Sequence, residues 1–206
     1  MKDTRTGRRY SLMTAAFAAW MLILLPLSVH AQEVQPAARA EDADDIIFVG
    51  DSRFVQMKNA VGENPYLWIA KGSQGYDWFS GEAVAQIDAA VQSGTKILIN
   101  FGVNDVGNEK SYAELVNRKA AEWEEKGAEV YYASVNPVED GRYVTEEKVE
   151  KFNEKLQEDL NSAVEWIDSF SWLMEDGYTL TDGLHFSSDT YEKLYAFYLD
   201  ELMDEN

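Results

Sequence analysis

Short runs of apolar residues recur along the chain and alternate with segments in which apolar residues are spaced three or four apart. The short runs are rich in β-branched and aromatic side chains, which is typical of strands buried on both faces of a sheet. They predict strands at residues 46–49, 66–70, 96–101, 129–135 and 164–168.

The spaced segments predict helices with one buried face. We expect these helices at residues 54–60 and 80–92, from a capping box of Ser111 and Glu114 to Gly127, from an N-cap at Thr145 to Leu160, and after a loop over residues 169–187. Strands that alternate with helices are joined by right-handed crossovers. The pattern therefore predicts an α/β fold, a three-layer α/β/α sandwich with a parallel sheet of about five strands.

The first 31 residues have a pattern of their own. Basic residues lie within residues 2–9, residues 10–29 are mostly apolar, and Val29-His30-Ala31 offers small residues for cleavage before Gln32. This pattern predicts a secretory signal peptide. The apolar stretch is long for such a peptide, so an uncleaved membrane anchor is the alternative. Either interpretation puts the rest of the chain outside the cytoplasm, secreted or in the cell envelope.

The remainder of the chain divides into a tether and one domain. Residues 32–45 contain Pro36 and end in an acidic cluster, which is typical of a linker. Residues 46–206 carry a single alternation of strands and helices without an internal repeat. Because the chain has no cysteine, this domain cannot hold a disulfide or a thiolate metal site, and we expect no metal or other cofactor.

The charge of the chain limits its partners. Asp and Glu number 37 against 18 Lys and Arg, and the formal net charge is −19. Such a surface repels nucleic acid and anionic membranes. We therefore exclude nucleic acid as a partner and expect membrane contact only through an uncleaved leader.

A candidate nucleophile follows the first predicted strand. Gly50-Asp51-Ser52 allows a sharp turn and places a hydroxyl at the carboxyl edge of the sheet, where open α/β folds build their sites. The same three residues also suit a plain turn in which Asp51 or Ser52 caps a helix. The choice between these interpretations depends on residues far along the chain.

A candidate base lies near the other end of the chain. The sequence has two histidines, and His30 belongs to the leader, so the domain contains only His185. Asp182 precedes it in an Asp-x-x-His turn just before the last predicted helix. The carboxylate can orient one imidazole nitrogen and leave the other to act as a base. Ser52, His185 and Asp182 therefore form a candidate catalytic triad.

Candidate oxyanion donors follow the second and third predicted strands. Gly102-Val103-Asn104-Asp105 offers the side-chain amide of Asn104, and the Gly-rich loop 71–78 offers the N–H of Gly75. The N–H of Ser52 is the third candidate. Because parallel strands end at a common edge, all three donors are expected there.

These blocks together resemble the SGNH, or GDSL-type, hydrolase family. The matching segments are Gly50-Asp51-Ser52, a glycine in the loop after the second strand, Gly102 to Asp105, and Asp182 to His185. They occur in the family's order and span residues 50–185. The resemblance implies a flavodoxin-like fold, Ser52 as nucleophile, His185 as base oriented by Asp182, and an oxyanion hole of Ser52, Gly75 and Asn104.

The sequence departs from the family pattern at two points. Arg53 stands where the family name has leucine, and Gly72 competes with Gly75 for the second block. The Gly-x-Ser-x-Gly elbow of α/β-hydrolases is absent, because Gly72-Ser73-Gln74-Gly75 is one residue too short.

Several residues near the expected site have two interpretations. Asp51 and Asp105 are more simply explained as turn or loop caps than as catalytic groups. Arg53 could pair with one of these carboxylates or steer an anionic substrate. The loop aromatics could stack on a sugar ring or cover the core; they are Trp78, Trp172 and Tyr178.

We therefore expect an exported serine ester hydrolase without a cofactor. Its substrate would be a small-molecule or carbohydrate ester from which it removes a small acyl group, such as acetyl, through an acyl-enzyme. One alternative is an O-acyltransferase that uses the same residues. The other is a glycan-binding module that keeps the fold without catalysis.

Overall fold

The computed structural model describes residues 45–142 and 144–204. The predicted leader, residues 1–31, and residues 32–44 of the predicted tether lie outside the described residues. Asp45, assigned to the tether, is the first residue of strand β1. Along the described part of the chain, none of the helices is long and apolar enough to cross a membrane.

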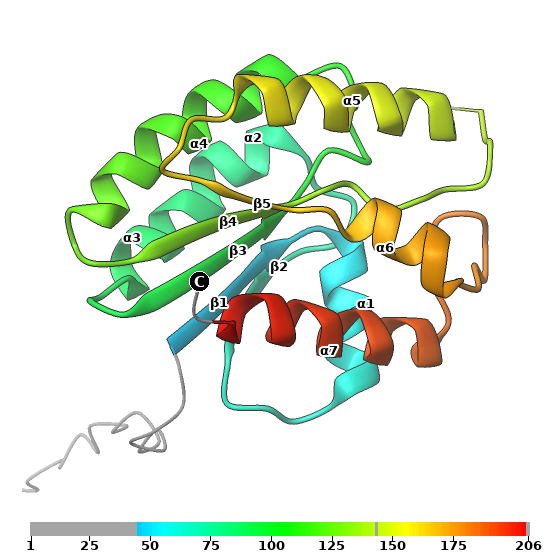
Figure 1. Ribbon diagram of the computed structural model, residues 1–206, viewed down its shortest axis with the longest axis horizontal. Helices are drawn as coiled ribbons and strands as arrows, with labels where there is room; N and C mark the ends of the chain where they lie inside the picture. The colour runs from blue at the N-terminus through cyan, green and yellow to red at the C-terminus, as the bar shows by residue number, and fades with distance from the viewer. Residues whose placement is uncertain (1–44, 143, 205–206) are drawn as a thin grey trace, which may run out of the picture. The chain divides into compact units, whose positions relative to one another are not determined.

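Five parallel strands form one sheet in the order β2-β1-β3-β4-β5. Their bounds are Asp45–Gly50 for β1, Leu67–Ala70 for β2, Thr95–Asn100 for β3, Glu129–Ala133 for β4 and Glu165–Ile167 for β5. All five predicted strands are therefore confirmed, with β5 at an edge of the sheet. The predicted α/β fold class is also confirmed (Figure 1).

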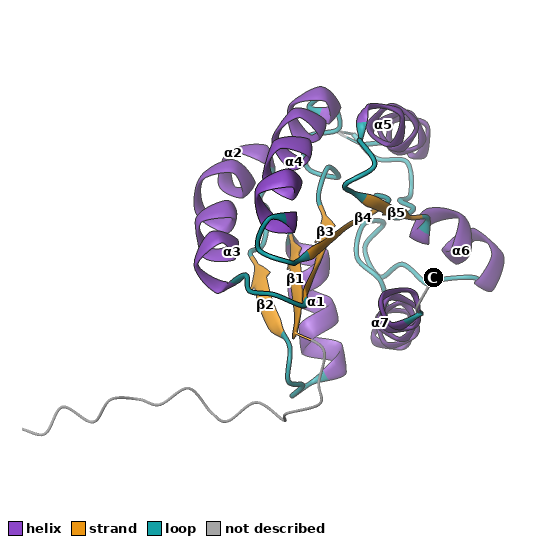
Figure 2. Cartoon of the chain, turned by 60° about the vertical axis from the view of Figure 1, so that its left-hand side comes forward, coloured by secondary structure: helices purple, strands orange, loops and turns teal. Residues whose placement is uncertain are grey.

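Helices cover both faces of this sheet (Figure 2). On one face lie α2 (Tyr76–Trp78), the π-helical turn η1 (Phe79–Ala83), α3 (Val84–Ala90), α4 (Glu109–Glu124) and α5 (Glu146–Asp159), and on the other lie α1 (Ser52–Val61), α6 (Ser169–Asp176) and α7 (Ser188–Met203). This arrangement explains the unbroken apolar runs. Strand β1 alternates between the two layers, with Ile47 and Val49 in one core cluster and Ile46 and Phe48 in the other.

Two predicted helix starts differ from the structure. Helix α1 begins at Ser52, because the Asp51 side chain accepts a hydrogen bond from the Arg53 N–H and caps the helix. The capping box predicted at Ser111 is wrong. Helix α4 begins at Glu109, so Ser111 lies inside its first turn.

Two predicted loops contain helices. The stretch 169–187 was expected to be a loop, but α6 occupies Ser169–Asp176, where Asp168 caps the helix by accepting from the Ser171 N–H at 3.1 Å. Helix α2 likewise begins at Tyr76 inside the predicted Gly-rich loop. Both segments are too short to show a helical repeat of apolar residues, so tertiary packing decides their conformation.

Candidate active site

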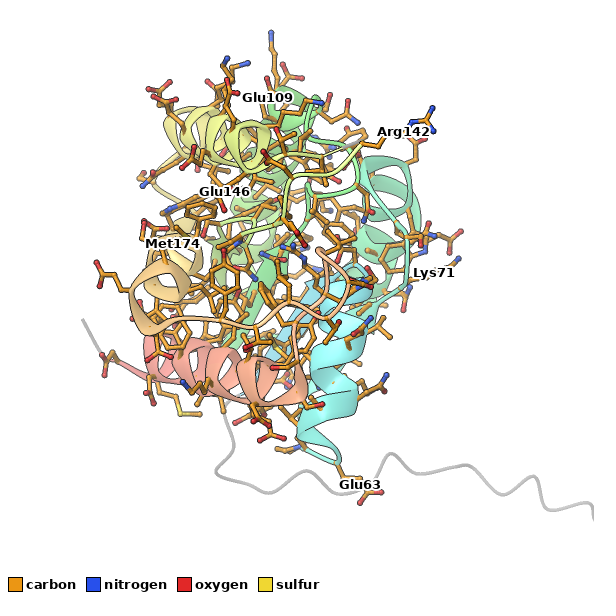
Figure 3. All side chains as sticks on the ribbon, turned by 90° about the vertical axis from the view of Figure 1, so that its right-hand side faces the viewer. Glu63, Lys71, Glu109, Arg142, Glu146 and Met174 are labelled. Atoms are coloured by element: carbon orange, nitrogen blue, oxygen red, sulfur yellow. The ribbon has the colours of Figure 1, made fainter. Side chains whose placement is uncertain are left out.

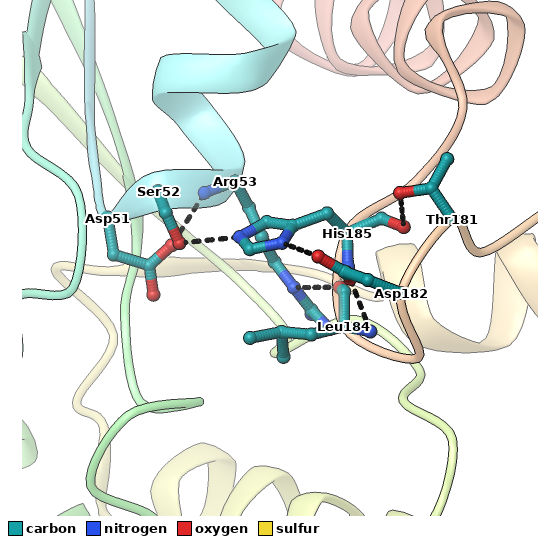
Figure 4. A network of polar contacts seen from close by, with 7 residues as sticks. All are labelled: Asp51, Ser52, Arg53, Thr181, Asp182, Leu184 and His185. Atoms are coloured by element: carbon teal, nitrogen blue, oxygen red, sulfur yellow. Dashed lines mark hydrogen bonds and ion pairs between the residues drawn. The ribbon is translucent and has the colours of Figure 1, made fainter.

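Two loops from opposite ends of the described chain meet at the carboxyl edge of the sheet. Ser52 begins α1 directly after β1, and His185 lies in the loop before α7. The Ser52 Oγ lies 2.9 Å from His185 Nε2, and His185 Nδ1 lies 2.8 Å from Asp182 Oδ2 (Figure 4). The structure thus brings the three candidate triad residues into one continuous hydrogen-bonded chain.

The Asp182 carboxylate organises the turn that carries the histidine. Its Oδ1 accepts from the backbone N–H of Leu184 at 3.0 Å and of His185 at 2.7 Å, while Oδ2 faces the ring. The hydrogen bond from the His185 side chain, followed by those from the backbone, lowers the pKa of Asp182 to about 2. An ionised Asp182 favours the tautomer with the proton on Nδ1, which leaves Nε2 as an acceptor for the serine hydroxyl.

Asp51, the residue before the serine, lies beneath the site and is 1% exposed. Its carboxylate accepts from the Arg53 N–H at 2.9 Å and from Asn104 Nδ2 at 3.0 Å. Loss of solvent raises its pKa to about 6, although the Arg53 N–H and charge oppose this shift. The capping interpretation of Asp51 is confirmed, and the same side chain also holds the Asn104 amide.

The two candidate oxyanion donors outside Ser52 do not converge in this structure. Asn104 Nδ2 donates to Gln74 O at 2.8 Å as well as to Asp51. In a planar trans peptide the C=O and the following N–H point in opposite directions, so the Gly75 N–H points away from Asn104. Both N–H bonds of the Asn104 amide are therefore used within the protein.

The two competing glycines occupy different places in the Gly-rich loop. A Cβ on Gly75 would lie 2.5 Å from Asp105 Oδ2, whereas one on Gly72 would lie 4.0 Å from Ser52 Cβ. Gly75 is thus required by the close approach of the Asp105 carboxylate, and Gly72 lies nearer the serine. Which of their N–H groups faces a substrate stays a prediction.

Asp105 anchors the surrounding loops. Its carboxylate accepts from the Tyr76 N–H at 2.7 Å, from Asn108 Nδ2 at 3.0 Å and from the Tyr112 hydroxyl at 3.0 Å. These bonds tie the Gly-rich loop to the loop between β3 and α4. The interpretation of Asp105 as a loop cap is confirmed.

Solved structures of other proteins share the fold of this chain. No family model matches the chain, and no curated protein was found to be similar to it. Solved structures are similar: a lipase/acylhydrolase from Enterococcus faecalis matches with a TM-score of 0.56 and 18% identity over 78% of this chain and 95% of that one. A GDSL-like lipase from Bacteroides thetaiotaomicron gives 0.58 and 15% over 78% and 89%.

A third similar structure is the C-terminal catalytic domain of peptidoglycan O-acetyltransferase A from Streptococcus pneumoniae, with a TM-score of 0.59 and 19% identity over 80% of this chain and 97% of that one. The chain has the SGNH hydrolase fold. At these identities the likeness establishes the fold, and the chemistry depends on the residues described above.

Arg53 replaces the leucine of the SGNH pattern and has a role that sequence reasoning missed. Its side chain is 1% exposed. The guanidinium donates to Leu184 O at 3.1 Å, Asn136 O at 2.8 Å and Pro137 O at 3.0 Å. All three acceptors are backbone carbonyls. Arg53 therefore joins α1, which begins at Ser52, to the loop that carries His185 and to the loop after β4. An arginine directly after the serine was the only signal in the sequence.

The three aromatic residues predicted to lie in loops pack against the core of this SGNH fold, and two of them, Trp78 of α2 and Trp172 of α6, lie in helices. Trp172 stacks on Phe197 with ring centroids 4.6 Å apart, and Tyr178 meets the edge of Phe186 at 5.6 Å. The ring centroids of Trp78 and Phe101 lie 6.1 Å apart. A cavity beside the site is bordered by Asn104 and Asp182, and none of the three aromatic residues lines it. Their interpretation as sugar platforms at this cavity is therefore not supported.

A cavity of about 810 Å³ lies beside the triad. Its walls are the loop after β3, which includes Asn104, residues 139–142 and 144 before α5, and the loop before α7 at Asp182 to Leu184. Within residues 45–142 and 144–204, His, Asp and Glu do not gather into a group that suits a metal ion. The cavity offers polar groups from three loops to a substrate.

Proposed function

We propose that this protein is a serine ester hydrolase that works through an acyl-enzyme. The observation that carries the proposal is the hydrogen-bonded chain from Asp182 through His185 to Ser52. The half-buried Ser52 Oγ and His185 Nε2 lie 2.9 Å apart, and this geometry is what nucleophilic activation requires. The SGNH fold, shared with proteins named as acylhydrolases, supports the same chemistry.

The proposed reaction has two steps. Ser52 Oγ attacks the ester carbonyl carbon while its proton moves to His185 Nε2, and the imidazolium then gives that proton to the departing alcohol oxygen. Water next attacks the acyl-Ser52 carbonyl, passing its proton through His185 back to the serine oxygen, and the free acid leaves. The ionised Asp182 stabilises the imidazolium in both steps.

The negative oxygen of each tetrahedral intermediate needs hydrogen-bond donors. We assign this role to the Ser52 N–H, the Asn104 amide and the Gly75 N–H. Because Asn104 Nδ2 already donates to Asp51 and Gln74, binding must exchange the Gln74 bond for one to the substrate. Rotation of the Gln74–Gly75 peptide would release Asn104 and also turn the Gly75 N–H toward it. Catalytic hydrogen bonds often tighten only in the substrate complex.

The proposed substrate is a carbohydrate ester with a small acyl group, such as acetyl. The cavity lining combines polar side chains, such as Asn104, Asn108 and Glu139, with an apolar surface to which Val106, Val144 and Leu184 belong. In the proposed complex the small acyl group packs on the apolar part, and the polar side chains form hydrogen bonds with sugar hydroxyls.

Acyl transfer to a sugar hydroxyl is the second candidate. It uses the same residues, and the similar Streptococcus pneumoniae domain is named as an O-acetyltransferase. The cavity volume of about 810 Å³ leaves room for an acceptor sugar. Against it, the Asp182 side chain is 56% exposed, so water reaches the site and favours hydrolysis.

Export of the protein is likewise a proposal. Its support is the predicted leader at residues 1–31. Expression of the full chain followed by N-terminal sequencing of the mature protein tests it, with a new terminus at Gln32 as the expected result. A protein that stays in the cytoplasm would refute export and leave the chemistry untouched.

The test of the function is an ester panel run on the full chain and on matched variants. Wild type should hydrolyse nitrophenyl acetate and acetylated sugars faster than long-chain esters, and a fluorophosphonate should label Ser52. Ser52→Ala and His185→Ala should abolish turnover with unchanged circular dichroism, whereas Ser80→Ala serves as a control. Measuring free acetate against acetylated acceptor separates hydrolysis from transfer. Absence of both labelling and turnover in a folded wild type would refute the proposal.

A further inference from the structure

A second pocket lies at the outer edge of the sheet, where the end of α1 and the turn after it meet β2. Its volume is about 570 Å³, within the range of about 300–1,000 Å³ that is typical of small-molecule sites. We call it the edge pocket. Its lining side chains belong to Lys58, Asn59, Glu63, Asn64, Tyr66 and Trp68.

The edge pocket is separate from the triad. Because an α-helix rises about 1.5 Å per residue, Ser52 and Gly62 at the two ends of α1 lie about 15 Å apart. In Figure 3, Glu63 in the turn after α1 lies well apart from Lys71, which follows β2 at the carboxyl edge. A ligand in the edge pocket therefore does not occupy the place of the ester.

The indole of Trp68 forms a flat wall of the edge pocket. Trp68 lies on the edge strand β2 opposite Phe48 of β1, and the two rings stack with centroids 4.3 Å apart. Phe54 and Tyr195 each lie 6.0 Å from the indole, and they lie 5.9 and 5.6 Å from Phe48. Rings this close to Phe48 do not cover the opposite face of the indole. The core thus covers one face of Trp68 and leaves the other to the pocket.

The turn between α1 and β2 holds this indole in a fixed orientation. Asn64 Oδ1 accepts from Trp68 Nε1 at 2.9 Å and from the Tyr66 N–H at 3.3 Å, while Asn64 Nδ2 donates to Gly62 O at 2.9 Å. Gly62 has φ of 71°, a left-handed conformation that favours glycine. A ligand that stacks on Trp68 therefore loses little binding free energy to ordering of the protein.

The polar groups of the edge pocket define the class of ligand. Lys58, Asn59 and Glu63 are exposed, and the lysine and the glutamate carry opposite charges, so the pocket favours neither anions nor cations. Among the described residues that line it there is no Leu, Ile, Val or Met, so an acyl chain would find few apolar contacts. An aromatic face beside hydrogen-bonding groups matches a sugar ring, which has a face of C–H groups and a rim of hydroxyls.

We propose that the edge pocket binds a neutral sugar unit of a glycan and anchors the protein to it. The C–H face of the sugar stacks on Trp68. Its hydroxyls form hydrogen bonds with the Asn59 amide, the Lys58 ammonium and the Glu63 carboxylate. Since this binding involves neither Ser52 nor an ester, the inference is independent of the proposed function.

The binding test is NMR on the ¹⁵N-labelled full chain, in which the Nε1–H of Trp68 gives its own resonance, assigned by its loss in Trp68→Phe. The probes are the neutral sugars cellohexaose, xylohexaose and hexa-N-acetylchitohexaose, with hexagalacturonate as the charged comparison. We expect at least one neutral sugar at millimolar concentration to shift the Trp68 resonance.

Two variants and a matched control locate the binding. Lys58→Ala/Asn59→Ala changes exposed residues of α1 to a good helix former, so it should fold and bind the sugar about tenfold more weakly. Trp68→Ala should abolish binding. The control is Trp166→Ala, because Trp166 of β5 at the other edge of the sheet also stacks on a ring of the neighbouring strand, with 9° between the planes. It should bind as wild type does. If Trp68→Ala does not fold, the double variant decides.

Each outcome has a clear meaning. A Trp68 shift that the double variant weakens and Trp166→Ala keeps supports the sugar site even if the protein hydrolyses no ester. The proposal is overturned if no neutral sugar shifts Trp68, if the shifts are confined to His185 and Asn104, if the double variant binds as tightly as wild type, or if hexagalacturonate binds more tightly than every neutral sugar. These results would leave the Ser52 chemistry standing.

Discussion

Replacing Arg53 by the leucine of the SGNH pattern tests how the site is held together. The guanidinium donates to the carbonyls of Leu184, Asn136 and Pro137 at 2.8 to 3.1 Å, and all three acceptors belong to loops at the carboxyl edge of the sheet. Leucine cannot donate a hydrogen bond. Arg53→Leu therefore leaves three carbonyls without partners in a region that water scarcely reaches.

The size of the effect follows from those contacts. An unsatisfied buried polar group costs about 1–3 kcal/mol, so three cost about 3–9 kcal/mol. Burial lowers the pKa of Arg53, so removing this desolvated charge returns part of the loss. We expect the free energy of unfolding to fall by about 3 kcal/mol or more, which for a domain of this size lowers Tm by roughly 6–12 °C.

The same substitution should reduce catalysis. Leu184 directly precedes His185, and its carbonyl is the acceptor for Arg53 Nε. A histidine loop that shifts by about 1 Å can cost up to about 10²-fold in rate, so kcat for nitrophenyl acetate should fall about 10- to 100-fold with little change in KM. Arg53→Lys keeps the charge but cannot reach three carbonyls, and its kcat and Tm should lie between those of wild type and Arg53→Leu.

The assays are thermal and urea unfolding together with steady-state kinetics at a temperature where each variant is folded. Arg118→Leu is the control, because the Arg118 side chain is 62% exposed and, among the residues that the structure describes, it pairs only with Glu122 on its own helix. Its stability should change by less than about 1 kcal/mol. If Arg53→Leu retained the Tm and kcat of wild type, the role assigned to these three hydrogen bonds would be refuted.

Three further substitutions test other contacts. Asn104→Ala should lower kcat about 10²- to 10³-fold while Asn108→Ala, at the same cavity, changes it little; equal kinetics for both would remove Asn104 from the oxyanion hole. Asp51 has its pKa raised from 3.8 to about 6, so its contribution to stability is lost as pH rises through this range, and Asp51→Asn should gain up to about 3 kcal/mol relative to wild type between pH 4 and pH 7 in urea unfolding. If the difference in the free energy of unfolding between Asp51→Asn and wild type did not change with pH, burial would not be the cause of the raised pKa of Asp51. Ser73 has φ of 57°, a left-handed conformation that costs about 1 kcal/mol, so Ser73→Gly should not lower Tm, whereas Ser111→Gly inside α4 should.

The local pattern of the chain determined most of the architecture. Each buried strand carried its own signal, because a strand covered on both faces must be apolar throughout, as in Ile46 to Val49. The order of strand and helix then restricted the topology to a parallel sheet. The place of Ser52 and Asn104 at strand ends followed from the same order, since parallel strands end at a common edge, whereas His185 lies beyond α6 in the loop before α7.

Local signals failed where short segments depend on distant contacts. Helix α6 is only eight residues long, and its Asp168 cap resembles any other turn aspartate in the sequence. Ser111 and Glu114 match the sequence pattern of a capping box, yet α4 starts earlier, at Glu109. The Asp105 carboxylate accepts hydrogen bonds from the Asn108 side chain and the Tyr112 hydroxyl, and these contacts between the loop and the first turn favour the earlier start.

The candidate site also has features that the sequence predicted and contacts that only the packed structure shows. The sequence supplied the residue types and their order, including a serine, an Asp-x-x-His turn and an asparagine after β3. Only the tertiary structure decided that Arg53 binds three carbonyls, that Asn104 donates to Asp51 and Gln74, and that Trp68 lines a pocket at the edge of the sheet. The physical reason is that residue spacing determines which side chains share an element, whereas hydrogen bonds between loops depend on how closely distant segments approach after packing.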